Sequence, residues 1–546
     1  MNKITNLRIN FINLIKKAEN KTKKNILNNK QIYTKKNEYQ QLFFKKPAYL
    51  FNIVDKLISE KQMEKAEIIL YEKLKTIIED NQIIFSDLIP DFFINLSKRG
   101  TSNTIGKKFF FIVQKIARQI NKFNKSMSEL EFLLNVEIKS EIKKINNNLL
   151  LIKNINKKIN DIKNEPNSII FNKKNEIENL IVDRQILSNQ LNEIAGIKSL
   201  EKNNNFFLFL NKKIILLENF KKNDIFPAHG SYFSNKMSVG YQLKKKKTMK
   251  ILDPVITTGT LGAILKFRTI QLESTKNKIG QLIYNFSNNF NFINRYGYDI
   301  NCNPGVKIFS ETNPKIIPNK NNKGKEKLNS KWNTYNVFYP KTYEIQFLGK
   351  NKWKIKNFFN NKEIIDFKTE KKKNALSLSL LKFDGIIIEY LNKSLKKNDK
   401  YLIQSTATAI DKFSIESNVT EKTNIAYFPT NNTDRDDYLN FQKMIDSKNY
   451  KLINNKETME ESYENYKNHI QEKIEQLKLN QRLKVKEENI LLEKNMYELN
   501  NNIFFQNLNK KPKNLDNLHL SNYKTSSLEP SLNEISEIIK IFNSKF

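Results

Sequence analysis

The segment from Thr257 to Phe309 constrains the fold more than any other part of the chain, because it combines helical periodicity with glycine punctuation. Apolar residues recur in it at the spacing i, i+3, i+4, i+7, i+11 and i+14, which lines one face of an α-helix. These residues are Ile279, Leu282, Ile283, Phe286, Phe290 and Ile293. Such a face requires a packing partner, so the segment is typical of an assembly module rather than of an active site.

Turn-forming residues follow this helix and indicate where it stops. Gly297 stands where a residue in the left-handed conformation would cap the C-terminus of the helix. The next stretch, 299–305, contains Asp, Asn, Pro and Gly, the residue types that favour turns, and it precedes Phe309. The sequence therefore predicts a helix, a stop and a turn, in that order.

Helical and β-rich patterns alternate along the rest of the chain. Helical periodicity dominates to about residue 200 and returns from Met459, while β-rich runs such as 343–347 and 383–390 lie between them. The apolar and aromatic stretch 206–217 is typical of a strand. We therefore predict an N-terminal helical region (1–200), a small β element (201–255), a central helical segment (256–300), a β-rich outer domain (301–425) and a C-terminal helical region (426–546).

The C-terminal region contains the seam of a second long helix. Its apolar and aromatic residues follow one another at spacings of three or four, as a coiled-coil-like contact requires. They are Tyr463, Tyr466, Ile470, Ile474 and Leu477. Because helices occur at both ends, we predict an α+β multi-domain fold in which long N- and C-terminal helices pack as a coiled-coil-like bundle and β domains are inserted between them.

The charge of the chain allows two interpretations. Lys and Arg number 94 against 57 Asp and Glu, a formal net charge of +37, which by itself indicates a nucleic acid or an anionic membrane as partner. Only eight of the 94 basic residues are arginine, whereas proteins that read bases favour arginine for its bidentate fork. Lys, Asn and Ile share AT-rich codons, so base bias explains their abundance together. A lysine-rich nucleic-acid-binding protein is the alternative hypothesis.

Residues suited to catalysis or metal binding are sparse. Cys302 is the only cysteine, so neither an intramolecular disulfide nor a cysteine-based metal site can form. His229, His469 and His519 lie too far apart in sequence for a recognised metal spacing. The chain contains no Gly-x-Ser-x-Gly, His-Glu-x-x-His or Gly-x-Gly-x-x-Gly motif. We therefore expect no catalytic residues, no cofactor and no metal; an enzyme would need a cleft with perturbed titratable groups.

Two short motifs come nearest to known ligand sites. The stretch 100–108 has five residues between its glycines where a phosphate-binding loop has four, and Lys108 where that loop has Ser or Thr. We expect a helix-to-helix turn there. The stretch 434–437 gathers carboxylates without the ligand spacing of a calcium loop, and we expect a solvated turn.

No apolar stretch is long enough to cross a bilayer. The stretch 206–217 is interrupted by polar residues and falls short of the roughly 20 apolar residues that a transmembrane helix needs. The apolar stretch 11–15 is short and is not followed by a small-residue cleavage site. We expect neither membrane insertion nor a cleaved signal peptide.

Ten residues of the central segment are candidate assembly or packing residues: Gly259, Leu261, Gly262, Phe267, Arg268, Gly280, Leu282, Phe286, Phe290 and Gly297. In these residues the segment resembles the family of flagellar hook-associated protein 1, whose members join the hook to the filament in bacterial flagella. Shorter similarities to the family occur at 184–196, 463–470 and 514–516. The chain length is also similar.

The resemblance implies a structural protein that forms the junction layer at the distal end of the hook, outside the cell. It implies as partners the hook protein, a second hook-associated junction protein or flagellin, and further copies of the chain in a ring. It also implies passage through the flagellar export apparatus without a cleaved signal peptide, and an export chaperone that binds the C-terminal helix.

The termini depart from the family pattern. The stretch 25–35 keeps only part of the family's N-terminal motif and lacks the glycine before Tyr33, and Pro530 interrupts the C-terminal helix. Close packing of helices inside a narrow tube needs small residues, and long lysines add repulsion. We therefore expect the terminal assembly surfaces to be altered.

Overall fold

The structure is a computed structural model that describes residues 48–508. Within this range it does not describe 98–101, 167–172, 203–204, 212–213, 234, 243–248, 300, 334–339, 350–351, 359–362, 369, 372–378, 392, 421–424, 431–438 and 454.

The chain forms two compact units, one of residues 47–489 and one that joins 1–46 with 490–546. Of the second unit the structure describes only residues 490–508, the end of one helix. The arrangement given below is that of the first unit.

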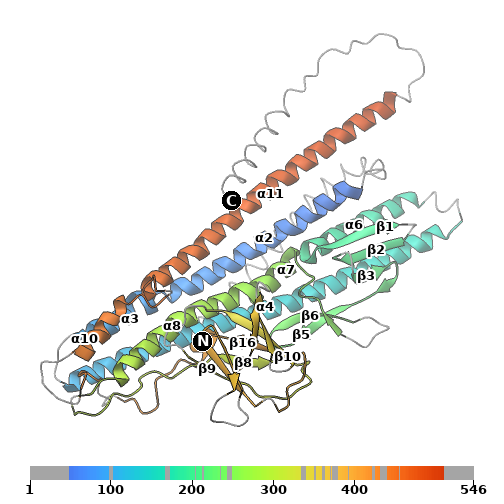
Figure 1. Cartoon of the computed structure of the whole chain (residues 1–546). Coiled ribbons are helices and arrows are strands. Elements are labelled where there is room, and N and C mark those ends of the chain that lie inside the picture. The colour runs from blue at the N-terminus through green and yellow to red at the C-terminus, as the bar shows by residue number, and fades with distance from the viewer. Residues whose placement is uncertain are drawn as a thin grey trace. The chain divides into compact units, whose positions relative to one another are not determined.

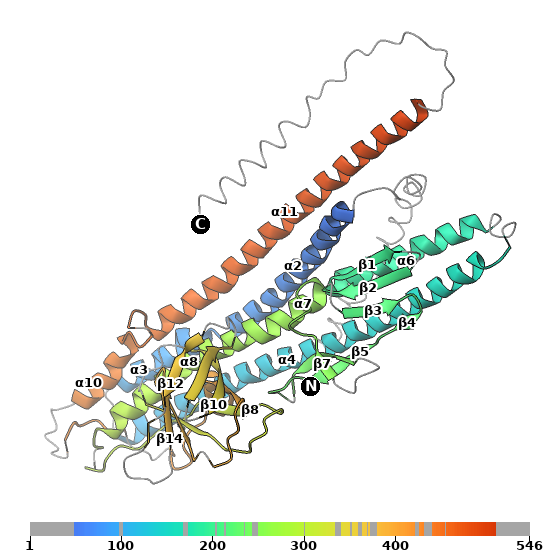
Figure 2. The same ribbon diagram turned by 45° about the vertical axis from the view of Figure 1, so that its right-hand side comes forward.

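Helices that are far apart in sequence lie side by side in this unit (Figures 1 and 2). Two π-helical turns, η2 (Ile84–Leu88) and η3 (Phe267–Leu272), lead into the helices that follow them, and a 3₁₀ turn, η4 (Ser447–Asn449), follows α10. The α-helices are α2 (Ala48–Asp80), α3 (Ile89–Ser97), α4 (Ser102–Lys163), α6 (Lys174–Ala195), α7 (Gly259–Lys266), α8 (Glu273–Arg295), α9 (Ala407–Lys412), α10 (Leu439–Asp446) and α11 (Met459–Leu508).

The longest helix, α4, spans 62 residues and is amphipathic along its whole described length. Its buried residues recur every three or four positions, as one face of a helix requires. They include Ile116, Ile120, Phe123, Met127, Leu130, Leu134 and Ile138. One side of α4 therefore faces the core and the other faces outward.

The described strands form small antiparallel sheets. The first sheets have the orders β1-β2-β3-β4 and β5-β6-β7, and the later ones β12-β11-β10-β16-β8 and β13-β14-β15-β9. The strands are β1 (Ile197–Lys202), β2 (Asn205–Leu210), β3 (Ile214–Glu218), β4 (Lys221–Lys222), β5 (Ile225–His229), β6 (Met237–Gln242), β7 (Met249–Ile251), β8 (Lys315–Pro318), β9 (Asn329–Trp332), β10 (Thr342–Gly349), β11 (Lys352–Asn357), β12 (Glu363–Lys368), β13 (Glu370–Lys371), β14 (Ser379–Phe383), β15 (Ile386–Tyr390) and β16 (Lys400–Gln404).

Turn residues explain two of the hairpins. The stretch 206–217 forms the paired strands β2 and β3 rather than one strand, and Asn211 between them has φ of 48°. Asp384 and Gly385, with φ of 42° and 74°, join β14 to β15. Two successive positive φ values match the right-handed twist of a two-residue hairpin.

The described residues form two hydrophobic cores. The larger core joins the helices with the first two sheets. The smaller core lies within the later strands, around the fully buried Trp353, whose Nε1 donates to the hydroxyl oxygen of Tyr390 at 2.9 Å. The β-rich part therefore has a core of its own.

The predicted seam of α11 packs on α2, and the two helices run antiparallel. Tyr463, Ile470, Ile474 and Leu477 are buried. Gln82, just beyond α2, donates to Glu464 at 2.8 Å, and Lys478 lies 2.8 Å from Glu72 in the middle of α2. Lys484, later in α11, lies 2.7 Å from Glu64, which is nearer the start of α2 than Glu72. The predicted α+β multi-domain fold with long packed helices is confirmed.

The type of secondary structure changes near the predicted boundaries. The helices give way to β1 at Ile197, and α7 begins at Gly259. Strands β8 to β16 lie between Lys315 and Gln404, and α10 begins at Leu439. The five regions themselves stay a prediction.

Candidate functional site

Nine of the ten candidate residues lie on one continuous helical segment formed by α7, η3 and α8, and Gly297 lies just beyond its end. The backbone stays right-handed helical at Phe267 and Glu273, where the parts join. All ten candidate residues are buried within the chain. They therefore pack the interior of a single copy, and a role for them in contacts between copies stays a prediction.

The predicted apolar face of α8 forms the centre of an aromatic cluster. All six residues of that face are buried. Phe290 lies 4.9 Å from Phe92 of α3 between ring centroids, and Phe286 lies 5.2 Å from Phe309. The contact between Phe290 and Phe92 is edge-to-face, a geometry that adds about 0.5–1.5 kcal/mol per pair beyond the burial of area. The cluster fastens α8 to α3 and to the segment that follows the turn.

Two glycines permit close contacts between this helix and other backbone. Gly259 starts α7 with φ of +76°, and a Cβ there would lie 2.5 Å from the carbonyl carbon of Ile194 in α6. A Cβ on Gly280 would lie 2.7 Å from the carbonyl carbon of Thr406, which precedes α9. Side chains larger than hydrogen do not fit at such distances.

The prediction that Gly297 caps the helix in the left-handed conformation is wrong. The helix α8 ends at Arg295, Tyr296 caps it with φ of −89° and ψ of 2°, and the positive-φ glycines do not include Gly297. Close packing explains the glycine instead, because a Cβ there would lie 2.7 Å from Cγ of Asn440 and 2.9 Å from the carbonyl oxygen of Phe428. The predicted turn after it is present, with Asp299 accepting from the backbone N–H of Asn303 at 2.8 Å.

Buried asparagines of α8 hold the surrounding irregular segments. Asn291 donates to the carbonyl of Phe309 at 2.7 Å and accepts from the backbone N–H groups of Ile308 and Phe309 at 2.9 and 3.0 Å. Asn294 donates to the carbonyl of Val306 at 2.7 Å and accepts from the N–H of Ala426 at 2.9 Å. These side chains thereby supply hydrogen bonds to buried backbone groups that have no partner in a helix or sheet. Sequence reasoning missed this role.

Sequence reasoning also missed that Arg268 belongs to a cluster of charges, in which Glu131, Lys236, Arg268 and Glu273 are buried and Asp253 and Lys276 are half-buried. Glu131 of α4 lies 2.8 Å from Lys276 of α8 and 3.7 Å from Lys236. Lys236 also pairs with Glu273. Gln404 of β16 donates to Glu273 at 2.8 Å. The cluster thus connects the helices to the β-rich part.

Burial and neighbouring charges act against each other in this cluster. Burial disfavours the charged form of Glu131, but Lys236 and Lys276 outweigh burial, so the pKa of this carboxyl is lowered. Burial raises the pKa of Asp253 although Arg268 lies beside it at 3.4 Å. Removing one partner from such a cluster leaves a buried charge uncompensated. The cluster is therefore a structural connection whose strength depends on pH.

The similarity at 184–196 corresponds to the packing of α6. Arg184 is buried, donates to Glu201 of β1 at 2.9 Å and lies 4.2 Å from the ring centroid of Phe206. Gly196 follows α6 in the left-handed conformation with φ of 64°. The guanidinium thus links α6 to the first two strands of this sheet.

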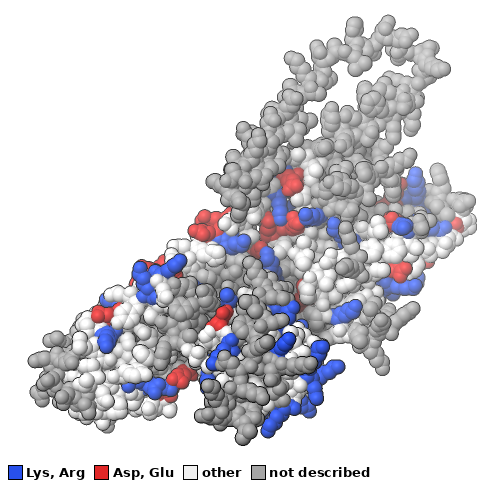
Figure 3. All heavy atoms as spheres, in the orientation of Figure 1, with Lys and Arg blue, Asp and Glu red and all other residues white. Residues whose placement is uncertain are grey.

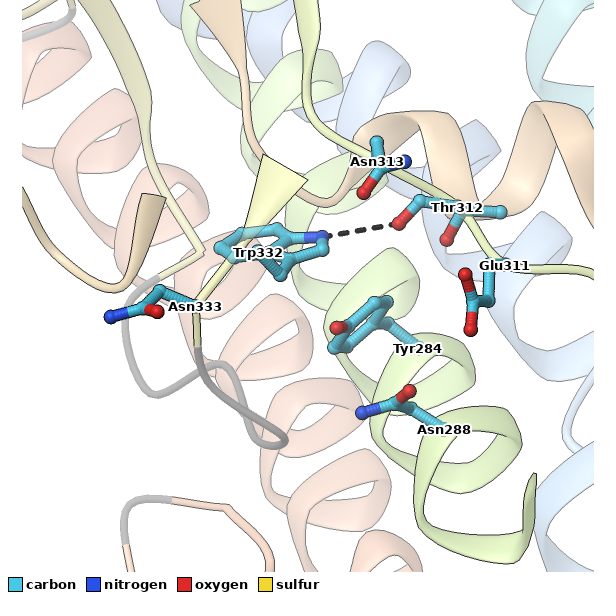
Figure 4. A pocket seen from close by; sticks show the side chains of 7 residues that line it. All are labelled: Tyr284, Asn288, Glu311, Thr312, Asn313, Trp332 and Asn333. Carbon is cyan, nitrogen blue, oxygen red and sulfur yellow. Dashed lines mark hydrogen bonds between the residues drawn. The ribbon is translucent and has the colours of Figure 1, made fainter. Parts of the chain in front are cut away.

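A pocket of about 330 Å³ lies where α8 faces the β-rich part (Figure 4). The rings of Tyr284 and Trp332 lie 5.2 Å apart between centroids, and Trp332 donates to the carbonyl of Thr312 at 3.1 Å. Burial raises the pKa of Tyr284. The pocket is lined by Tyr284, Asn288, Glu311, Thr312, Asn313, Trp332 and Asn333.

The remaining candidates are scattered. His229 lies in β5, His469 lies in α11, and Cys302 is exposed in the turn. His519, the stretch 434–437 and the start of the stretch 100–108 lie outside the described residues. Within the described part of the chain, no three His, Cys, Asp or Glu residues gather as metal ligands, and no helix there is long and apolar enough to span a bilayer.

Lysines and arginines are unevenly spread on the face seen in Figure 3. They gather over the lower part of the β-rich elements, whereas the helices show both signs of charge. Several lysines of the helices are paired with carboxylates, as in the contacts of Lys266 with Glu67 and of Lys478 with Glu72, each at 2.8 Å. A part of the positive charge thus stabilises the fold.

Comparisons with known proteins agree on the helical part. A family model described as the helical domain of the flagellar hook-associated protein FlgK matches residues 72–309, which include all ten candidate residues. The flagellar hook-associated protein 1 of Buchnera aphidicola subsp. Schizaphis graminum is 26% identical over 449 residues, which cover 82% of this chain and 78% of that protein. The protein of the same name from Salmonella typhimurium is 23% identical over 402 residues, covering 72% and 70%.

The fold agrees with a solved structure. The flagellar hook junction protein FlgK from Burkholderia pseudomallei matches with a TM-score of 0.70 and 15% sequence identity. The match covers 82% of this chain and 99% of the solved chain. The arrangement of helices and strands described above is therefore that of a known fold.

Proposed function

We infer that the chain belongs to the family of flagellar hook-associated protein 1, that it is a structural component of the flagellum at the junction of hook and filament, and that its copies associate into a ring at the distal hook end. The observation that carries this proposal is the match of residues 72–309 to the family's helical domain, because these residues supply most of the larger hydrophobic core. The alternative of a lysine-rich nucleic-acid-binding protein gains no support from these matches.

The ring would have partners on both sides along the flagellum. We propose that it binds the hook protein below and a second hook-associated junction protein or flagellin above. Family membership supports this proposal, since a protein at the junction contacts the structures that it joins. We expect the binding to use surfaces of α2, α4 and α11, because α8 is enclosed by its own chain.

Family membership also suggests how the protein reaches its place. We propose that the flagellar export apparatus passes the chain out of the cell without cleavage of a signal peptide, and that an export chaperone binds the C-terminal helix. The protein would then be extracellular. The family is a structural one, and we propose neither catalysis nor a cofactor.

Immunogold electron microscopy of isolated hook and basal structures tests the proposed location. An antibody to this chain should label the distal hook ends, and the same antibody should label none in a strain without the gene. Diffuse label in the cytoplasm, with bare hook ends, would contradict the proposal.

A further inference from the structure

The outward side of α4 carries a surface that we call the basic face, the exposed residues from 107 to 143. Phe111, Phe132 and Val136 are exposed there by 53%, 64% and 47%, on the side of the helix opposite its buried residues. Eight exposed basic residues and one exposed acidic residue, Glu129, accompany them. Large apolar side chains among charges of one sign are typical of an interaction surface.

A second surface, which we call the acidic face, consists of the exposed residues from 69 to 94 on α2, η2 and α3. It has five acidic residues and no basic one, and its apolar members are Ile69, Ile83 and Ile94, exposed by 47%, 43% and 42%. Two lysines contact this face: half-buried Lys75 lies 3.5 Å from Glu79, and Lys478 of α11 lies 2.8 Å from Glu72. Base bias, which enriches lysine, does not produce such a face in a chain of charge +37.

The two faces lie at the same level along the helices. Gln119 of α4 donates to Asn81, just beyond α2, at 3.1 Å, and the rings of Phe109 and Phe92 lie 5.3 Å apart between centroids. Since α2 and α4 run antiparallel here, twelve residues back along α2 and twelve forward along α4 cover the same length, about 18 Å. The acidic face is thus level with the basic face from residue 107 to about residue 131.

Each face lies on the side of its helices opposite their buried residues, so the two faces of one copy do not meet. The buried rings of Phe92 and Phe109 fill the space between α3 and α4. In both views α2 and α4 lie on opposite sides of α7 and α8 (Figures 1 and 2). A neighbouring copy, rotated about an axis parallel to the helices, would bring its acidic face to this basic face without any shift along the axis.

We propose that the acidic face of one copy docks on the basic face of α4 in the next copy. Contact between two different faces makes a head-to-tail interface. Copies joined in this way form a closed ring when the rotation from each copy to the next adds up to a full turn. Opposite charges set the register, and the apolar residues supply the buried area. This inference rests on the proposed ring and names the surfaces that form it.

Cysteine cross-linking on isolated hook ends tests the contact. Cys302 is first replaced by Cys302→Ser, because it is exposed. Asp87 and Lys115, both exposed, lie near the level of the Phe92 and Phe109 pair, so the Asp87→Cys, Lys115→Cys variant should form disulfide-linked multimers. Each single variant should stay monomeric under oxidation. The Asp87→Cys, Lys143→Cys control, on the same face but about 42 Å further along α4, should form no multimers.

The results separate this inference from the proposed function. If the Asp87→Cys, Lys115→Cys variant labels hook ends with immunogold but forms no disulfide-linked multimers, the inference is overturned and the junction role stays intact. Dimers from the Asp87→Cys variant alone would also overturn it, because they would show like faces in contact. Bare hook ends in every variant and in the wild type would contradict the junction role itself.

Charge reversal supplies a second measurement. Asp80→Lys with Asp87→Lys should reduce the fraction of labelled hook ends at least tenfold, and adding Lys115→Glu with Lys122→Glu in the same chain should restore it. The control, Lys393→Glu with Lys397→Glu, alters exposed residues of the β-rich part and should leave the labelling unchanged. Equal labelling of all these variants would overturn the inference.

Discussion

Replacing Gly280 by alanine tests how tightly α8 is held against the segment before α9. In an exposed helix this change would stabilise by about 1 kcal/mol, because glycine is the poorer helix former. Here the added Cβ would lie 2.7 Å from the carbonyl carbon of Thr406 and 3.3 Å from the nitrogen of Ala407. Both atoms belong to backbone that is fixed by a hydrogen bond from Thr406 Oγ1 to the carbonyl of Asn277, 2.6 Å long.

The expected result is a net loss of stability. Overpacking a tight contact costs about 1–3 kcal/mol, and a rigid backbone neighbour places this contact at the upper end. After subtraction of the propensity gain, the free energy of unfolding should fall by about 2 kcal/mol. For a domain of about 150–250 residues this corresponds to a melting temperature that is about 4–8 °C lower.

Thermal unfolding followed by circular dichroism at 222 nm measures this loss in the helical part. Gly349→Ala is the matched control, since a Cβ there meets nothing within 4 Å and only its φ of +93° opposes the change. That control should leave the helical transition in place. A Gly280→Ala protein that melts at or above the wild-type temperature would show that the contact accepts a methyl group, and would refute the reasoning.

Three further substitutions, with Phe292→Asp as an exposed control, test the site in urea unfolding. Phe286→Asp, at a ring that is 2% exposed, should lower the free energy of unfolding by several kcal/mol, whereas Phe292→Asp, at a ring that is 37% exposed, should cost about 1 kcal/mol or less. Asn291→Ala leaves two N–H groups and one carbonyl unpaired and should cost about 3 kcal/mol, with a cost near zero contradicting the role of the amide. Glu131→Gln should destabilise the protein most at neutral pH. The pKa of Glu131 is lower in the folded protein than its unfolded value of about 4, so the charged carboxylate stabilises the fold above that value. This stabilisation is lost as the pH falls through the folded pKa. A difference from wild type that does not shrink on acidification would contradict this assignment.

The sequence predicted the parts of the fold that depend on local pattern. The apolar spacing on α8 and the seam on α11 define buried faces, since each residue's place on a helix follows from its number. The turn after α8 followed from residue types that favour turns. The prediction for Gly297 was wrong because a glycine after a helix has two explanations, a left-handed cap and a close contact. Only the segment that packs against it, here the one with Asn440, distinguishes the two.

The rest of the site could not be predicted because abundant residues conceal it. Asn291 and Asn294 are two of many asparagines, and nothing in their spacing separates a buried amide from a solvated one. The same is true of Lys236 and Lys276 among the lysines. Their partners come from distant parts of the chain, such as Glu131 on α4, and pairings of this kind follow from the packing of the elements rather than from local pattern.

The amide of Asn291 also has a consequence for the exchange of backbone hydrogens with solvent. Ile308 and Phe309 lie in an irregular segment, where amides ordinarily exchange within seconds to minutes because local opening is easy. Their N–H groups are held by a side chain of α8, most of whose residues are buried, so we expect deuterium to enter only when α8 itself separates from its surroundings. A loop would then exchange as slowly as the core, and its two amides would report the opening of the whole helical part.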